Sequence, residues 1–339
     1  MEYKHIKLTN LDDLEQADKS TLTDIELYLN TDDMNKQQLN DFQSQLQQCT
    51  ELQSLVIRIN TYYLQDHQLQ VLIENLSQFK NLNTVNLLLQ GNRINEEGAK
   101  LIGLALKDCQ QLKAVKLQLE LNGIRNNGVQ SILAGLNNCT LLESLELNIS
   151  ENQISDEGLE GIGLWKNYNS LTYLTLKANF NHICDKGCMS IATGIGNCSS
   201  LTSLVLSLFE NRIGEEGASA LGQGLSKLKN LINLLLYIES NSIGDKGISD
   251  LCIGLSNCIQ LQNLNFSFYE NNISSEGYLK VDQCLSSLPK LSKLECFFSG
   301  SEKLLKSRDL LNCKNIRFLQ GSKKQEGAQV EGTQNQKIS

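Results

Sequence analysis

The sequence predicts an α/β solenoid in which one parallel sheet lines the inner, concave face and helices cover the outer, convex face. Three series of residues predict it: a leucine, an asparagine and a glycine each recur at intervals of 30 residues. All three series are one residue short at the same place, between Gly158 and Leu171. Agreement of three registers over seven units indicates stacked repeats, each of which contributes one strand and one helix to a shared core.

The repeat unit reads L-x-x-L-x-L-x-L-x-x-N-x-I-x-x-x-G and continues into a stretch with helical spacing. The leucines that open each unit are Leu52, Leu82, Leu112, Leu142, Leu171, Leu201, Leu231, Leu261 and Leu291. The asparagines are Asn92, Asn122, Asn152, Asn181, Asn211, Asn241 and Asn271. The glycines are Gly98, Gly128, Gly158, Gly187, Gly217, Gly247 and Gly277.

Each unit contains one strand signal and one helix signal. Leu204, Leu206 and Leu208 alternate with other residues, which predicts a strand with one buried face. Leu221 and Leu225 are four residues apart, which is the spacing of a buried helix face. Acidic residues such as Glu215 and Glu216 precede this stretch, where a negative charge favours the start of a helix.

The repeat asparagine has a predicted structural role. Its amide can both donate to and accept from backbone groups of the bend between units. We therefore expect these asparagines to form a buried ladder that satisfies backbone groups outside the regular sheet.

These motifs resemble the leucine-rich repeat family, in its ribonuclease-inhibitor-like subclass with one strand and one helix per unit. The resemblance covers roughly residues 20–318 and implies a leucine-rich repeat horseshoe. It includes four cysteines that each lie three residues before an opening leucine: Cys109, Cys139, Cys198 and Cys258. Two residues are inserted before the asparagine relative to the family motif L-x-x-L-x-L-x-x-N. A longer strand, or a longer strand exit, would widen the concave face.

Three segments are expected along the chain. Residues 1–50 hold a degenerate N-terminal repeat that acts as a polar cap, and residues 51–318 hold the regular repeats. Residues 319–339 are polar and poor in apolar side chains, which predicts a disordered tail.

Composition excludes several classes of partner. The net charge of −8 argues against nucleic acid, whose binding needs a basic surface. No apolar stretch is long enough for a spanning helix, and the N-terminus does not read as a secretory signal, so no membrane insertion is expected. With no secretory signal, the eleven cysteines indicate reduced thiols and a cytoplasmic location. For an interaction protein of this kind, association with the cytoskeleton or with a larger complex is also expected.

Catalytic chemistry is sparse. The chain has only three histidines, none near a nucleophile signature or a paired carboxylate, so we expect no enzyme and no small-molecule substrate. One zinc site is conceivable at His182, Cys184, Cys188 and Cys198. Cys198 occupies a repeat position shared with units that lack such neighbours, and buried cysteine behaves as a small hydrophobe. We therefore expect no metal and no cofactor.

An alternative function is regulation of a small GTPase or another enzyme. The Ran GTPase-activating proteins share the fold of this family and use an arginine. Arg93 and Arg212 follow repeat asparagines and Arg58 lies on a predicted strand, but no local motif singles one out.

The concave face indicates a non-enzymatic scaffold that binds protein partners, or a structural subunit of a larger assembly. Residues between the strand leucines should point away from the core. In the early units these residues are polar and mixed in charge, whereas the later units expose aromatic side chains. The predicted partner-binding residues are Phe209, Tyr237, Tyr269, Phe297, Val205, Leu235 and Glu239. Aromatic side chains are favoured at interfaces, although they are also common in strands generally.

Acidic residues precede three of the repeat asparagines: Glu151, Glu210 and Glu270. They form either an acidic rim for a basic partner or a solvated edge.

Overall fold

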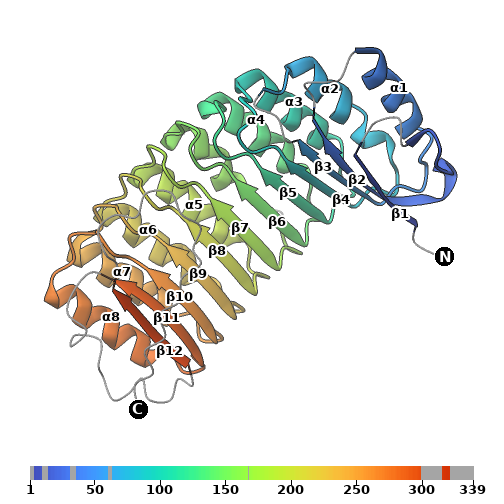
Figure 1. The fold of residues 1–339 in the computed structure, drawn as a ribbon. Helices are drawn as coiled ribbons and strands as arrows, with labels where there is room; N and C mark the ends of the chain where they lie inside the picture. Colours follow the sequence, from blue (N-terminus) through green and yellow to red (C-terminus); the bar gives the residue numbers. More distant parts are fainter. Residues whose placement is uncertain are drawn as a thin grey trace.

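One continuous parallel sheet forms the concave side of a curved, elongated molecule. The computed structural model describes residues 4–9, 14–30, 36–59, 63–166, 168–298 and 315–320. Its sheet has twelve strands, β1 to β12, in the order in which they occur along the chain. Every neighbouring pair is parallel. The helices line the convex side, and β1 and β12 lie at opposite ends of the array (Figure 1). The predicted α/β solenoid is confirmed.

The elements follow the repeat. The strands are β1 (Lys4–Leu8), β2 (Leu22–Leu29), β3 (Ser54–Ile59), β4 (Thr84–Leu88), β5 (Ala114–Gln118), β6 (Ser144–Asn148), β7 (Tyr173–Lys177), β8 (Ser203–Ser207), β9 (Asn233–Tyr237), β10 (Asn263–Ser267), β11 (Lys293–Phe298) and β12 (Asn315–Gln320). The α-helices are α1 (Lys36–Leu46), α2 (Asp66–Ile73), α3 (Glu96–Lys107), α4 (Arg125–Leu136), α5 (Asp185–Asn197), α6 (Glu215–Leu225), α7 (Gly244–Ser256) and α8 (Ser275–Ser287). The 3₁₀ helices are η2 (Lys19–Thr21), η4 (Leu76–Gln78) and η5 (Asp156–Leu164).

The repeat leucines make a core that is continuous from unit to unit. Leu204 on β8 pairs in register with Leu234 on β9, and that residue pairs with Leu264 on β10. All three are at most 2% exposed. Burial of such a stack removes apolar surface from water in every unit, at about 25 cal/mol per Å². A unit has no second apolar layer of its own, so its stability depends on its neighbours.

The two residues inserted before the asparagine lengthen the strand exit, not the strand itself. Most strands have five residues, but pairing of the backbone continues past them. The Leu208 N–H donates to the Tyr237 carbonyl at 2.8 Å, and the Glu210 N–H donates to the Glu239 carbonyl at 3.2 Å. The residue before the asparagine then turns into the left-handed region, with φ of 51° at Glu210 and 58° at Leu121. The concave face therefore carries one more row of side chains than the strands alone provide.

The repeat asparagines hydrogen-bond to backbone across the bend. The Asn152 side chain donates to the Leu119 carbonyl at 2.9 Å and to the Ser150 carbonyl at 2.8 Å. Its oxygen accepts from the Ile124 N–H at 3.2 Å. The donor contacts recur at the other positions, and the acceptor contact recurs at all of them except Asn92, whose oxygen is buried without a partner. The residues Asn92, Asn152, Asn181, Asn241 and Asn271 are buried, and Asn122 and Asn211 are half-buried. Each amide thus joins its own unit to the preceding one.

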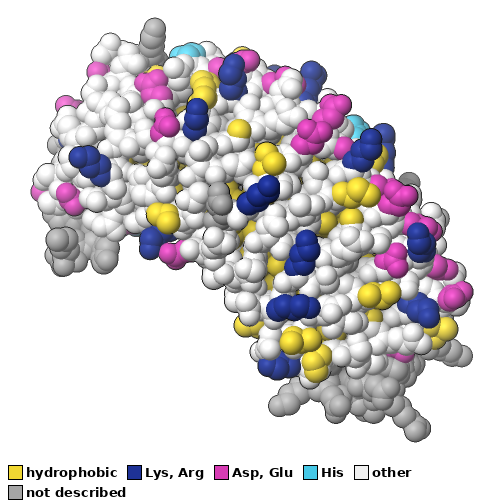
Figure 2. Space-filling view, turned by 180° about the vertical axis from the view of Figure 1, so that it is seen from behind, with side chains coloured by type: hydrophobic (Ala, Val, Ile, Leu, Met, Phe, Trp, Pro, Cys, Tyr) yellow, Lys and Arg dark blue, Asp and Glu magenta, His cyan; other side chains and the backbone are white. Residues whose placement is uncertain are grey.

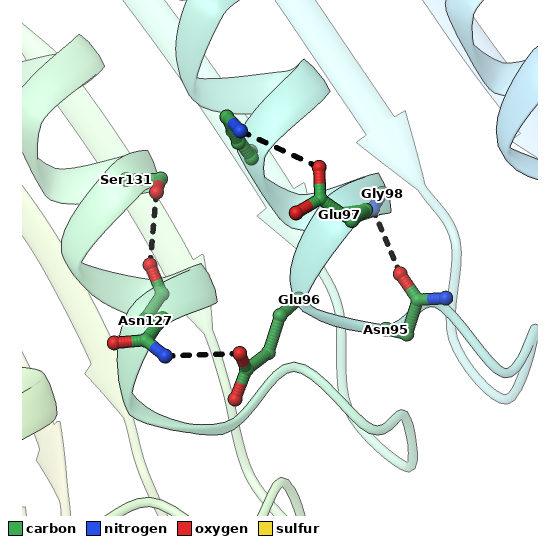
Figure 3. A network of polar contacts seen from close by, with 7 residues as sticks. Asn95, Glu96, Glu97, Gly98, Asn127 and Ser131 are labelled. Atoms are coloured by element: carbon green, nitrogen blue, oxygen red, sulfur yellow. Dashed lines mark hydrogen bonds and ion pairs between the residues drawn. The ribbon is translucent and has the colours of Figure 1, made fainter.

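Polar side chains at the helix starts also join successive units. In Figure 3 the Asn95 oxygen accepts from the Gly98 N–H at 3.0 Å within α3, and Asn127 of α4 donates to Glu96 at 3.0 Å. At α5, the Asp185 Oδ1 accepts from the backbone N–H groups of Gly214 at 2.7 Å and Gly217 at 2.9 Å. An acidic residue at the start of one helix therefore favours that helix and also caps the helix of the next unit.

The shortened unit folds as a tighter helix. Where one residue is missing, the chain forms η5, a 3₁₀ helix, instead of the α-helix found in neighbouring units. Trp165 and Tyr168 follow it, are buried, and meet edge to face with ring centroids 5.3 Å apart. The Tyr168 hydroxyl donates to the Leu136 carbonyl at 2.7 Å. Large side chains fill the volume that the missing residue leaves open.

The two ends differ from the regular units. The predicted N-terminal cap contributes two strands, because β1 precedes the expected strand β2 and pairs with it. At the other end β12 reaches Gln320, two residues into the segment expected to be a tail. The rest of that segment, 321–339, lies outside the described residues. Within the described part of the chain, no helix is both long and apolar enough to cross a membrane.

Candidate protein-interaction site

Two adjacent rows of side chains cross the C-terminal half of the concave face. In the first row the strand register places Ser207, Tyr237, Ser267 and Phe297 side by side on β8 to β11. Large rings therefore alternate with small hydroxyl side chains, since every second strand carries an aromatic residue. The two serines are buried, at 5% and 2% exposure.

The second row lies in the strand exits and alternates in the opposite sense. The Glu210 N–H donates to the Glu239 carbonyl, and the Ser240 N–H donates to the Tyr269 carbonyl at 3.0 Å. These bonds extend the strand register by two residues and place Phe209, Glu239 and Tyr269 side by side. Aromatic residues from the two rows are thus staggered over four consecutive strands.

All four aromatic residues are partly exposed. Tyr237 and Phe297 lie within β9 and β11, whereas Phe209 and Tyr269 lie two residues past the ends of β8 and β10. The alternating pattern had predicted strand positions for all four. The remaining predicted apolar residues, Val205 and Leu235, are paired neighbours on β8 and β9 and are half-buried. Together these six side chains make an aromatic-rich surface, called here the concave patch.

Glu239 was predicted as an outward-facing, partner-binding residue of the concave face, but it is buried. Its side chain is 9% exposed, because bulky side chains flank it in its row and Tyr237 precedes it. Burial raises the pKa of its carboxyl to about 7, although its own backbone and the Ser267 hydroxyl hydrogen-bond to it. The carboxyl oxygen Oε2 is buried without a hydrogen-bond partner. The patch therefore covers a carboxyl group at its centre.

Phe180 extends the patch and was missed from the sequence. It is 48% exposed, and its ring meets Phe209 edge to face with centroids 4.7 Å apart. It precedes Asn181, at the left-handed position where three other units have glutamate, with φ of 52°. The signal in the sequence was an aromatic residue directly before a repeat asparagine. The sequence analysis considered that position only for its acidic residues.

The N-terminal half of the concave face differs in chemistry. Lys116 on β5 and Glu146 on β6 form an ion pair at 2.7 Å. In the next row Asn148 donates to Gln118 at 3.3 Å. These polar side chains hydrogen-bond to one another across the strands, so their groups already have partners within the protein.

The acidic residues before the asparagines lie on an exposed edge. Glu151, Glu210 and Glu270 all adopt the left-handed conformation and are exposed. Glu270 accepts from the Ser240 hydroxyl at 2.8 Å. On the face shown in Figure 2, acidic and basic side chains are mixed along the molecule, with hydrophobic side chains in small separate groups.

Of the described cysteines, all except Cys184 are buried as small core residues. Among the described residues, no three histidine, cysteine or acidic side chains are placed to hold a metal ion. Cys188 and Cys198 are buried, and the Cys198 thiol donates to the Gly194 carbonyl at 3.4 Å. Cys184 is half-buried, with its thiol 3.7 Å from the His182 carbonyl oxygen.

The three arginines considered for a GTPase regulator lie apart. Arg93 and Arg212 are exposed on the edge, in different units. Arg58 on β3 faces the ring of Tyr28, with its guanidinium carbon 5.5 Å from the ring centroid. The three arginines belong to three different repeat units.

Comparison with known proteins identifies the repeat. The family described as "Leucine Rich repeat" matches residues 138–163 and 197–222. Two segments of the chain thus match leucine-rich repeats. The two matched segments include the opening leucines Leu142 and Leu201. The first segment lies in the shortened unit, and the regular unit that opens at Leu171 lies between the two.

The leucine-rich repeat solenoid is also similar to a solved structure. That structure is the crystal structure of the Rad7 and Elc1 complex in yeast, and it aligns with a TM-score of 0.47 and 13% sequence identity. The alignment covers 92% of this chain and 80% of the other. No curated protein matches the sequence.

Proposed function

We propose that this leucine-rich repeat protein is a non-enzymatic scaffold, or a subunit of a larger assembly, whose protein partner binds the concave patch. The observation that carries the proposal is the staggered array of Phe209, Tyr237, Tyr269 and Phe297, all partly exposed on adjoining strands and strand exits. Exposed aromatic clusters invite aggregation unless a partner covers them. Tyrosine and phenylalanine are also enriched in the buried centres of protein interfaces.

We assign the chain to the ribonuclease-inhibitor-like subclass. Support comes from the 30-residue unit and from the full α-helix that follows most strands, α3 and α4 among them. We also propose a cytoplasmic location, with association to the cytoskeleton or to a complex. Cysteines of the repeat donate from their thiols to core carbonyls, as Cys139 does to Leu106 at 3.5 Å. Such packing requires thiols that stay reduced.

The test is a pair of double variants assayed against the protein that the intact chain recovers from an extract. Tyr237→Ala with Tyr269→Ala should weaken binding at least tenfold, since one interface hot spot contributes about 2 kcal/mol or more. The matched control is Leu104→Ala with Ile253→Ala, two exposed apolar side chains on the convex helices α3 and α7.

Folding and binding must be separated in this test. The melting temperature of the tyrosine variant should stay within about 3 °C of the parent, since the two rings are not core residues. Equal binding by the tyrosine variant, or loss of binding only in the control variant, would place the interface elsewhere.

A further inference from the structure

A buried carboxyl group lies beneath the concave patch, and the protein supplies only part of its hydrogen bonding. Ser267 hydrogen-bonds to Glu239, but Oε2 has no partner and is closed off from solvent. A carboxylate oxygen left in this state is unfavourable, because it has lost water and gained nothing in return. The feature is more typical of a binding site than of a packing interface.

The groups around Glu239 are aromatic or acidic. Burial raises the pKa of Tyr237, and Glu239 and Glu295 raise it further. Burial also raises the pKa of Tyr269, and Glu239, Glu270 and Glu210 add to the effect. Lys293, the nearby cation on β11, forms an ion pair with Glu295 at 3.5 Å. The site therefore favours a positive charge from outside the chain.

Glu120 provides a comparison within the same protein. It stands at the equivalent position, two residues before Asn122, and its Oε2 is likewise buried without a hydrogen bond. Burial raises the pKa of Glu120, but Lys177 and Lys116 lower it. Glu120 thus has basic side chains of the protein near it, and the neighbours in its row are Gln90 and Ser150. Of the two glutamates, only Glu239 is flanked by aromatic side chains.

We propose that Glu239 receives an arginine side chain of the protein partner, held between the rings of Tyr237 and Tyr269. This proposal rests on the interaction function proposed for the concave patch. A guanidinium group is planar, stacks on aromatic faces and donates two parallel hydrogen bonds to a carboxylate. Lysine offers a compact, strongly hydrated charge that matches such a slot less well. The two rings are partly exposed and lie at a strand end and in a strand exit, so they can turn aside to admit the group.

Binding of a cation is linked to release of a proton. Glu239 in the free protein has a pKa of about 7, so at neutral pH a large fraction of it is protonated. The groups next to it are Tyr237 on β9, Ser267 on β10 and Tyr269 in the exit of β10. Around these tyrosines lie further carboxyl groups, Glu295 near Tyr237 and Glu270 and Glu210 near Tyr269. The tyrosines remain neutral up to higher pH, since their own pKa values are raised. An arginine favours the ionised carboxyl and lowers its pKa, so affinity rises as pH increases through 7.

The experiment uses the full chain and a fluorescein-labelled nona-arginine peptide, with nona-lysine as the second probe, in 150 mM salt. Affinity of the parent for nona-arginine should rise about tenfold from pH 6 to pH 8, because the ionised fraction of Glu239 rises by about that factor over this range. Nona-lysine should bind more weakly than nona-arginine. Glu239→Gln should weaken nona-arginine binding at pH 8 by about tenfold, as expected for a charge-assisted pair, and remove the rise with pH.

The matched control is Glu120→Gln, which removes the same net charge at the same repeat position. It should leave affinity within about twofold and keep the pH dependence, since long-range attraction changes equally in both variants. If the two variants behave alike, the peptide binds through overall charge and the assignment to Glu239 is overturned. Equal affinity for nona-lysine overturns the choice of arginine.

Failure here is distinguishable from failure of the scaffold function. If Tyr237→Ala with Tyr269→Ala abolishes binding of the recovered partner while Glu239→Gln changes neither peptide nor partner binding, the patch binds protein but not through an arginine. If the tyrosine variant also binds the partner normally, both proposals fail. Circular dichroism of Glu239→Gln verifies that the variant is folded.

Discussion

Burial of Glu239 couples the stability of the fold to pH. The folded protein favours the protonated carboxyl, because burial raises its pKa from the ordinary 4.5 to about 7. Its contribution to stability is therefore complete below pH 4.5 and is lost as pH rises through 7. At pH 8 the ionised group costs on the order of 3 kcal/mol relative to the protonated one.

Glu239→Gln should consequently stabilise the isolated protein at pH 8 and have little effect at pH 4.5. Glutamine keeps the shape and hydrogen-bonding capacity of the neutral acid while removing the ionisation. Urea unfolding at the two pH values measures the difference, with Glu120→Gln as the comparison. A loss of stability at pH 8 would show that Glu239 is ionised at no cost in the fold. A residue that binds a partner at the expense of stability follows a known trade-off in proteins.

At the scale of elements, each helix start depends on the unit before it. Asp185 in α5 accepts from two N–H groups at the start of α6, so the cap and the helix belong to different repeats. The same relation links Asp156 to the Cys184 N–H at 2.7 Å and Asp245 to the Ser274 N–H at 2.7 Å. Close approach accompanies it: a Cβ at Gly254 of α7 would collide with the Gly222 carbonyl of α6. Adjacent helices are thus held together by backbone proximity and by caps.

Asp185→Ala should destabilise the protein by about 1 kcal/mol, the usual value of a lost helix cap. Because α6 loses its cap, the change should also increase amide exchange at the start of α6 more than within α5. Glu216→Ala is the control, since it removes an exposed acid from the first turn of α6 without removing a cap. Equal effects of the two substitutions on urea unfolding would mean that the helix dipole, not the cap, is responsible.

For the whole molecule, stability is a sum over neighbouring units. The sheet is one continuous ladder from β1 to β12, and its strands pair only with the preceding and following strands. Interior units have two stacking partners, whereas a unit near an end has a partner only on one side or an irregular one. Opening should therefore begin at the ends and progress inward.

Amide hydrogen exchange measures this directly. Slowest exchange is expected in β6 to β8, and faster exchange in β2 and β11. Binding at the concave patch would also protect β8 to β11 and their exits from exchange when the partner is bound, because the patch lies there. Uniform protection along the sheet would indicate that the solenoid unfolds as one cooperative unit.

Periodicity alone determined much of this protein. The position of every repeat leucine predicted which face of each strand is buried, since side chains alternate along a strand and the core needs one apolar face. The spacing of the repeat likewise predicted the parallel sheet, the helices and the contribution of asparagine to the bends. Local pattern suffices here because each unit repeats the same contacts with its neighbours.

Only the tertiary structure decided what depends on residues 30 positions apart. Alternation predicted that Glu239 points outward, but its burial results from Phe209 and Tyr269, which come from adjacent units. The two inserted residues of the motif form a strand exit that is still paired to its neighbours. In the unit that lacks one residue, the chain forms η5, and the large side chains of Trp165 and Tyr168 pack behind it. A one-dimensional pattern gives the direction of a side chain, whereas its exposure depends on the size of its lateral neighbours. Those neighbours are set by the stacking of the units.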